Sequence, residues 1–145
     1  MSKTYISRAL RQQVIDAALG RCAYCHTFVE ITGARFVVDH IIPEALGGET
    51  TFDNLCLACH ACNEFKGAQS MATDPTTEKS VSLFHPRQQR WRDHFRWSQE
   101  GIHIIGITAT GRATVSTLHM NHPDIIRARR RWINVGWHPP QDDLL

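Results

Sequence analysis

Four of the five cysteines in this 145-residue chain form two C-x-x-C pairs. Cys22 pairs with Cys25 and Cys59 with Cys62, and 33 residues separate the two pairs. Each pair can supply two thiolates from one tight turn, so together they provide the four tetrahedral sulfur ligands that zinc accepts. A site closed by four cysteines is structural. The spacing therefore predicts a zinc ion that joins two distant segments, with buried free cysteines or a redox pair as the alternatives.

The fifth cysteine leaves a second pairing open, because Cys56 and Cys59 also have C-x-x-C spacing. Alternation along the short strand expected at residues 55–57 points Cys56 away from a metal-binding turn at a helix start. We therefore predict that Cys56 is a buried core thiol. His26 and His60 adjoin predicted ligands and could replace a thiolate, although a neighbour that faces solvent is the commoner case. An odd number of cysteines argues against a disulfide framework.

A second group of reactive residue types stands in "VVDHIIPEALGG", where an apolar segment ends. Asp39 and His40 are adjacent there, and Asn54 and Asn63 lie close to the cysteine pairs in the sequence. Once zinc joins those pairs, the strand end and the helix expected at about 60–66 come close together. A carboxylate beside an imidazole can divide the work: the carboxylate binds a hard divalent cation such as magnesium, and the neutral imidazole acts as general base on a water.

A few short elements must position these residues. Ser7 is placed to cap a helix that stops at Gly20 and turns Leu10 and Val14 to one face. Strands are expected over "ARFVVDH" and "LCL", with a short helix over "ACHACNEFKGAQ". The predicted fold class is α+β, with a zinc-joined core of two strands and a helix, an N-terminal helix and a basic C-terminal α/β extension.

The predicted domain organisation has three parts. Residues 1–70 hold the N-terminal helix and the core, residues 71–80 form a connector rich in Ser, Thr, Asp and Pro, and residues 81–145 form the extension packed on the core. Within the extension, "GIHIIGITATGRATVSTL" predicts strands with glycine turns. A final helix follows, with Asn121 placed to cap it and Pro123 near its first position.

The charge is unevenly distributed along the chain. Residues 1–80 hold seven Lys or Arg against nine Asp or Glu, whereas residues 81–145 hold nine Arg against five acids. The basic half suits a polyanion such as nucleic acid, and a solvated arginine-rich surface is the alternative. Trp91 and Trp97 are interleaved with arginines and could stack on bases, although core positions are commoner for tryptophan. The candidate phosphate contacts are Arg87, Arg90, Arg92, Arg96, Arg127, Arg129, Arg130 and Arg131.

Composition excludes several classes of protein. Hydrophobic content of 42% with 21% charged residues is ordinary globular usage, so disorder is not expected. No apolar stretch reaches about 18 residues, which argues against a membrane span. The N-terminal segment has no apolar region of the kind that directs secretion. We expect a soluble cytoplasmic protein, and the sequence gives no indication of its oligomeric state.

The three segments "CAYC", "VVDHIIPEALGG" and "NLCLACHACNEFKG" resemble, in order and spacing, the HNH endonucleases with a ββα-metal core and a four-cysteine zinc site. The resemblance covers about residues 20–68. It implies Asp39 as a metal ligand, His40 as general base, Asn54 as the residue that braces the active-site loop, and Asn63 as the residue that completes the metal site.

The last motif position is histidine in many relatives, so the chain resembles an H-N-N variant. An amide oxygen is a harder ligand than imidazole, which favours magnesium or manganese at the catalytic site beside the structural zinc. Lys66 matches a lysine common in the family and is either a phosphate contact or a solvated side chain. The resemblance implies metal-dependent hydrolysis of DNA phosphodiester bonds. The alternative is a non-catalytic zinc module that binds nucleic acid or a protein partner.

Overall fold

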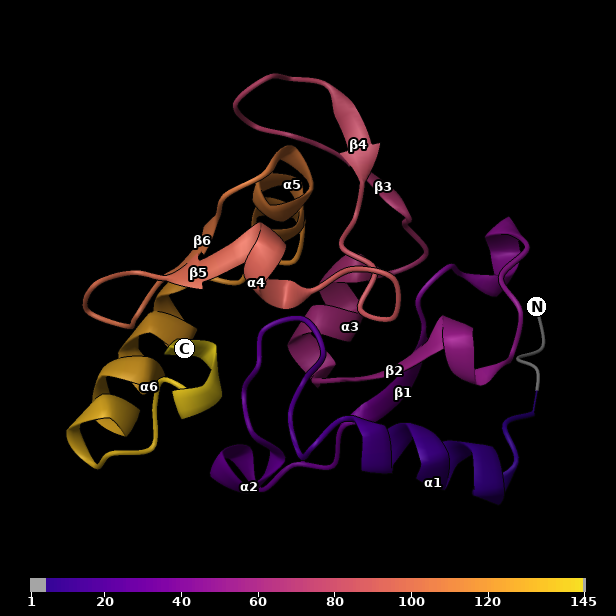
Figure 1. Cartoon of the computed structure of the whole chain (residues 1–145), viewed down its shortest axis with the longest axis horizontal. Coiled ribbons are helices and arrows are strands. Elements are labelled where there is room, and N and C mark those ends of the chain that lie inside the picture. Colours follow the sequence, from indigo (N-terminus) through magenta and orange to yellow (C-terminus); the bar gives the residue numbers. More distant parts are fainter. Residues whose placement is uncertain (1–4, 145) are drawn as a thin grey trace. The chain divides into compact units, whose positions relative to one another are not determined.

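The structure, a computed structural model, describes residues 5–144, so the outermost residues of the predicted N- and C-terminal parts lie outside it. The chain divides into two compact units, and each is described by itself (Figure 1). The units are Met1–Ser70 with His85–Gln89, and Met71–Phe84 with Arg90–Leu145.

The first unit begins with helix α1 (Arg8–Ala17). The Ser7 hydroxyl accepts a hydrogen bond from the backbone N–H of Leu10 at 3.1 Å, so the predicted cap is confirmed. Val14 is fully buried and fixes the inner face of the helix. The helix ends before Gly20, which has a φ of +76° that favours glycine.

An antiparallel hairpin and one helix form the centre of the first unit. Strand β1 (Val37–His40) pairs with β2 (Leu55–Ala58), and α3 (His60–Lys66) follows directly. The register places Asp39 opposite Cys56 and His40 opposite Leu55. In Figure 1 the hairpin lies between α1 and α3. The predicted α+β class and the ββα core are therefore confirmed. The unit also holds α2 (Val29–Thr32), η1 (Glu44–Leu46) and η2 (Phe52–Asn54).

The second unit consists of two small hairpins with helices against them. Helix α5 contacts β3, β4 and β6, and α4 contacts α5 and β5. Strand β3 pairs with β4, and β5 pairs with β6, both antiparallel. The elements are β3 (Met71–Thr73), β4 (Ser80–Ser82), α4 (Trp91–His94), β5 (Phe95–Trp97), β6 (Ile104–Gly106), α5 (Ala109–Thr117), α6 (Pro123–Asn134) and η3 (Gln141–Leu144).

Residues 71–80, predicted to be a connector, contribute a strand and a turn to the β3–β4 hairpin. Asp74 organises the turn, because its carboxylate accepts hydrogen bonds from the Thr76 N–H at 3.1 Å and the Thr77 hydroxyl at 2.8 Å. The Arg112 guanidinium donates to both oxygens of this buried carboxylate at 3.0 and 2.9 Å. A composition typical of a linker here reflects the polar bonding of a tight turn.

The prediction of strands across residues 101–118 is wrong for its second half, which forms helix α5. The Thr108 hydroxyl caps this helix by accepting from the Gly111 N–H at 3.0 Å. A Cβ at Gly111 would collide with the carbonyl oxygen of His94, so the glycine permits a close backbone approach and does not mark a turn. Tertiary packing outweighs the low helix propensity of a segment rich in Thr, Val and Gly.

The predicted cap of the last helix is also wrong. His122 caps α6, since its Nδ1 accepts from the Asp124 N–H at 3.2 Å. Asn121 instead exchanges hydrogen bonds with the backbone of Ile104 at 2.8 Å in both directions. Its Oδ1 also accepts from Arg129 at 3.0 Å. Arg129 is fully buried, so this arginine is a structural residue of the second unit and the predicted phosphate contact is wrong.

Candidate metal centre and active site

The first unit gathers four sulfur atoms from the two C-x-x-C pairs. The Sγ atoms of Cys22, Cys25, Cys59 and Cys62 all lie within 4.8 Å of one another. The Cys25 and Cys59 sulfurs are 3.8 Å apart, the separation of about 3.8 Å that a tetrahedron of sulfurs about 2.3 Å from zinc requires. The four cysteines are positioned to form a metal site.

Two short turns present these sulfurs. In the first, the N–H groups of Cys22 and His26 bond to the carbonyls of Thr27 and Cys22 at 3.0 Å, and His26 has a φ of +61°. In the second, Cys59 is the N-cap of α3, and its sulfur accepts from the Cys62 N–H at 3.4 Å. The sulfurs therefore converge from backbone geometry that the turns fix themselves.

Burial and the close approach of the sulfurs shift the pKa values of three of the four thiols. Burial raises the pKa of the Cys22 thiol, and hydrogen bonds from neighbouring sulfurs raise the pKa of Cys62. Hydrogen bonds from the same neighbours, Cys22 first, lower the pKa of Cys25. Four thiolates brought together in a buried site would repel one another, and a bound zinc ion would supply the positive charge that stabilises them.

Cys56 and the two neighbouring histidines are not members of the cluster. Cys56 is buried opposite Asp39, and burial raises the pKa of its thiol to about 12. His60 Nε2 donates to the carbonyl oxygen of Arg35 at 2.7 Å. His26 is buried in the first turn but is not among the ligand atoms. The geometry agrees with the choice of ligands made from the sequence.

Asp39 lies in a salt bridge inside the first unit. Its Oδ2 is 3.2 Å from the ammonium of Lys66 on α3. The same ammonium donates to the carbonyl oxygen of His40 at 3.0 Å. Burial raises the pKa of the Asp39 carboxyl, and Lys66 opposes that effect. Lys66 is 1% exposed and binds the end of β1, so the solvated alternative is wrong, and the phosphate contact stays a prediction.

His40 is held by two side chains that were not among the predicted site residues. Its Nε2 lies 2.9 Å from the Thr50 hydroxyl and 3.0 Å from a carboxylate oxygen of Glu44. Both residues belong to the loop after β1. The imidazole is thus held through one nitrogen, and the other, Nδ1, is the ring atom left to act on a proton. The i to i+4 spacing of His40 and Glu44 was the only sequence signal for this contact.

Asn54 braces the loop between the two strands. Its Oδ1 accepts from the Ile42 N–H at 2.8 Å, and its Nδ2 donates to the carbonyls of Ile42 at 3.0 Å and Glu49 at 2.8 Å. A Cβ at Gly48 would collide with the Ile42 carbonyl and crowd the Asn54 amide, which explains the second glycine of the motif. This geometry supports the bracing role that the family resemblance implies.

Asn63 lies on α3 three residues before Lys66, so the two share one side of the helix. Among residues 5–144 its side chain forms no hydrogen bond with another residue. Asp39 Oδ2 is buried and accepts no well-directed hydrogen bond despite the ion pair. Carboxylate and amide oxygens suit a hard divalent cation, so the donor types fit magnesium or manganese. The shared site of Asp39 and Asn63 stays a prediction.

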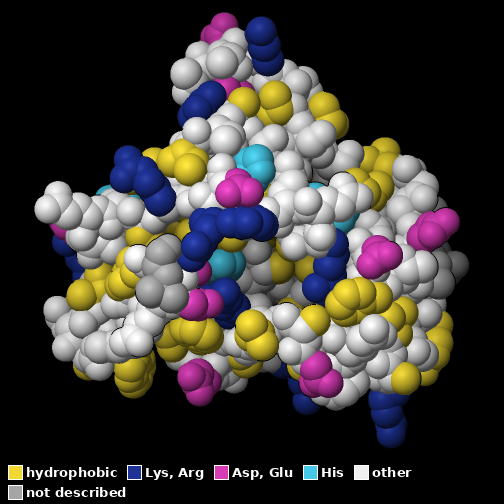
Figure 2. Space-filling model, in the orientation of Figure 1, with side chains coloured by type: hydrophobic (Ala, Val, Ile, Leu, Met, Phe, Trp, Pro, Cys, Tyr) yellow, Lys and Arg dark blue, Asp and Glu magenta, His cyan; other side chains and the backbone are white. Residues whose placement is uncertain are grey.

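The candidate DNA contacts differ in their surroundings. Arg87, in the first unit, donates from Nε to the carbonyls of Phe52 and Leu55 at 3.3 and 3.0 Å, so the protein itself already engages it. Trp91 and Trp97 are buried, so they occupy the core positions given as the alternative to stacking on bases. Figure 2 shows Lys and Arg side chains dispersed among acidic ones on the face in view. The exposed candidates are Arg90, Arg92, Arg96, Arg127, Arg130 and Arg131.

Comparison with known proteins finds one family match, which lies within the first unit. Residues 22–69 match the family model of the HNH endonucleases, a span that includes the four clustered cysteines, Asp39, His40, Asn54 and Asn63. The resemblance to the HNH endonucleases found in the sequence is therefore confirmed over residues 22–69.

One relative is the CRISPR-associated endonuclease Cas9 of Corynebacterium diphtheriae, which is 41% identical over 58 residues. The matched segment is 39% of this chain and 5% of that protein, so the chain spans a small part of its relative.

Within residues 5–144, no helix is both long and apolar enough to cross a membrane.

Proposed function

We propose that this protein is a metal-dependent endonuclease that hydrolyses DNA phosphodiester bonds. The match of residues 22–69 to the HNH endonucleases supports nuclease function in general terms. The observation that carries the specific proposal is the imidazole of His40 at the end of β1, which Glu44 and Thr50 hold through Nε2. A fixed imidazole with one ring nitrogen available is the arrangement a general base requires.

His40 would take a proton from water through Nδ1, and the water would attack phosphorus in line with the departing 3′ oxygen. Glu44 would orient the ring and stabilise its protonated form. Asp39 and Asn63 would hold the divalent cation, which supplies charge stabilisation at the phosphate and the leaving oxygen. Asn54 would keep the loop that carries Glu44 and Thr50 in place. Exposed arginines of the second unit remain candidate phosphate contacts.

The four cysteines would hold a structural zinc ion. None of the five cysteines forms a disulfide, which suits a reducing compartment, and we infer a cytoplasmic location. The zinc would join the turn of Cys22 and Cys25 to the start of α3. It would thereby fix the distance between β1 and the helix that carries Asn63 and Lys66.

A second candidate function is a zinc module that binds DNA without cutting it. The observation that favours it is the ion pair of Lys66 with Asp39, which places a fixed ammonium where a catalytic cation would have to bind. Supercoiled plasmid separates the two functions. The zinc-loaded protein should nick it when magnesium or manganese is added, leaving 5′-phosphate and 3′-hydroxyl ends. Binding of the plasmid without nicking in either metal would favour the zinc module.

A further inference from the structure

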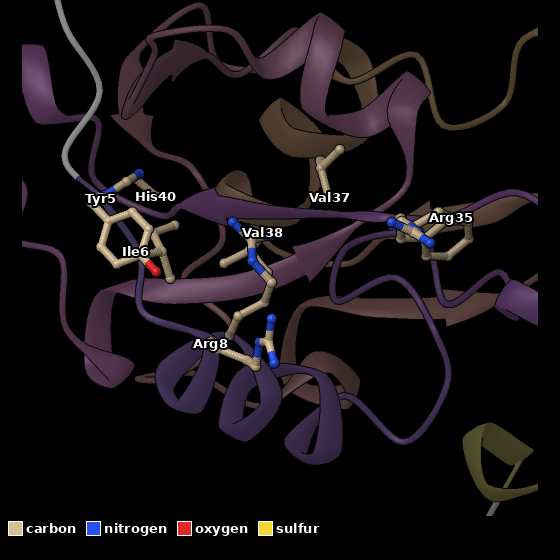
Figure 3. Close-up of a pocket in the computed structure, with 9 residues that line it drawn as sticks. Tyr5, Ile6, Arg8, Arg35, Val37, Val38 and His40 are labelled. Atoms are coloured by element: carbon tan, nitrogen blue, oxygen red, sulfur yellow. The ribbon is translucent and has the colours of Figure 1, made fainter.

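A cavity of about 680 Å³ lies on the first unit, lined by the start of α1 and by one face of β1 (Figure 3). Its lining includes Tyr5, Arg8 and Arg11 on one side and Arg35, Val38 and His40 on the other. The cavity thus reaches the candidate general base. None of its arginines was among the phosphate contacts expected from the sequence, because they lie in the half of the chain with net negative charge.

The positive charge of the cavity is not compensated. Arg8, Arg11 and Arg35 are exposed, no acidic residue lines the cavity, and none of the three forms an ion pair with another residue among 5–144. In contrast, Arg90 and Arg127 of the second unit each lie near a carboxylate, at 3.8 and 3.4 Å. Three free guanidinium groups in a cavity attract an anion of matching charge density.

The rest of the lining is apolar and aromatic. Phe36 is buried in the wall, Val38 faces α1, and the ring of Tyr5 is 83% exposed. Figure 3 shows Tyr5 beside His40 at one end, Arg35 at the other end and Arg8 between them. Guanidinium groups for phosphates combined with apolar and aromatic surface for sugars and bases are the features of a nucleic-acid groove.

The length of the cavity also matches a nucleic-acid strand. Five residue steps separate Arg35 from His40, which in extended chain is about 16 Å. One strand of B-form DNA rises about 3.4 Å per nucleotide, so this distance corresponds to about five nucleotides. The Arg35 backbone is fixed by the hydrogen bond from His60. Arg8 and Arg11 are three residues apart on α1 and therefore project from one face.

We propose that this cavity binds one strand of the DNA substrate. Arg8, Arg11 and Arg35 contact consecutive stretches of its phosphate backbone, and the strand leads the scissile phosphate to His40. This inference rests on the proposed function for its substrate, but the contact itself does not require cleavage. It predicts that sequence-independent affinity comes mainly from the first unit.

The test is DNA binding by the full-length, zinc-loaded protein without magnesium or manganese, so that the DNA stays intact. The variants are Arg8→Gln, Arg11→Gln and Arg35→Gln, singly and combined, since glutamine keeps the helix propensity of arginine. Lys79→Gln is the control. Lys79 is exposed and lies in the second unit, and its substitution removes one positive charge, as each arginine substitution does. Anisotropy of a short fluorescein-labelled duplex gives the dissociation constant at salt concentrations from about 50 to 200 mM.

Each groove variant should weaken binding several-fold, and the triple variant should lower the slope of log affinity against log salt by about 3. Lys79→Gln should change affinity less than about twofold. A triple variant that keeps the wild-type slope and affinity, with zinc content unchanged, would show that the cavity does not bind DNA. The nuclease proposal would not be affected by that result. If the wild type binds DNA through the cavity but does not nick plasmid, the nuclease proposal is wrong and the proposed DNA contact is still supported.

Discussion

The ammonium of Lys66 lies 3.2 Å from the carboxylate of Asp39 and donates to the carbonyl oxygen of His40. Both contacts are nearly buried, so one lysine fixes the end of β1 to α3. Its role is opposite to the solvent-facing one that its charge suggests. Asp39 consequently has a cation beside it before any metal binds, and a divalent ion must share or replace that partner.

Lys66→Met should destabilise the first unit, because it leaves a buried carboxylate without a partner. The free energy of unfolding should fall by about 3 kcal/mol. Chemical denaturation followed by circular dichroism measures the loss. Adding Asp39→Asn should recover part of it, since the unpaired charge is then removed. A Lys66→Met protein as stable as the wild type would show that the ion pair contributes nothing.

The zinc site predicts different results for two neighbouring cysteines. Cys59→Ser should lose the metal, about one zinc per chain in the wild type, and should unfold the first unit. Cys56→Ala should keep full zinc content, because its sulfur is not in the cluster. Elemental analysis of the purified proteins measures both. Wild-type zinc in Cys59→Ser, or its loss in Cys56→Ala, would contradict the ligand assignment.

Asn54→Ala should loosen the loop between β1 and β2. The change removes three hydrogen bonds and leaves the Ile42 N–H without its acceptor, at a cost of about 3 kcal/mol. Plasmid nicking should fall as well, because Glu44 and Thr50 lie on this loop. Zinc content should not change. Denaturation together with metal analysis checks the prediction, and wild-type stability of Asn54→Ala would refute the bracing role.

The pair of Asp74 and Arg112 predicts an acid sensitivity of the second unit. Hydrogen bonds from Arg112 hold the pKa of Asp74 below its ordinary value of 3.8. The stabilisation is therefore present above about pH 3.8 and is lost as the pH falls further. All four tryptophans lie in the second unit, so their fluorescence during acid titration reports on it. Asp74→Asn should lose that component of the pH dependence, and an unchanged profile would contradict the assignment.

The residues that specify the HNH domain were predictable because each depends on local spacing. The two C-x-x-C turns and the D-H pair at a strand end are recognised from the spacing of a few residues and do not depend on distant parts of the chain. Ser7 likewise caps α1 as its position indicates. Cys56 could be set aside by strand alternation alone. Such signals need only a few neighbouring residues.

The errors concern residues whose partners are distant in sequence. Lys66 meets Asp39 across 27 positions, and Arg129 meets the carbonyl of Ile102 across the same number. The charge of each side chain suggests that it faces solvent. Instead, buried carbonyl oxygens and a carboxylate accept the hydrogen bonds and balance the charge of these side chains inside the protein. Gly111 packs closely against the backbone of His94, and no pattern in the neighbouring sequence predicts this contact. These contacts appear only once the chain is folded.

His40 is proposed as the general base of a DNA endonuclease, and the nicking rate of His40→Ala is the sharpest test of that role. Supercoiled plasmid is incubated with manganese and either wild-type or variant protein, after both are shown to hold equal zinc and to bind DNA equally. Loss of the base should lower the rate by about 10²- to 10⁴-fold, while manganese binding measured by titration calorimetry stays near wild type. Nicking by His40→Ala at the wild-type rate would show that His40 is not the general base.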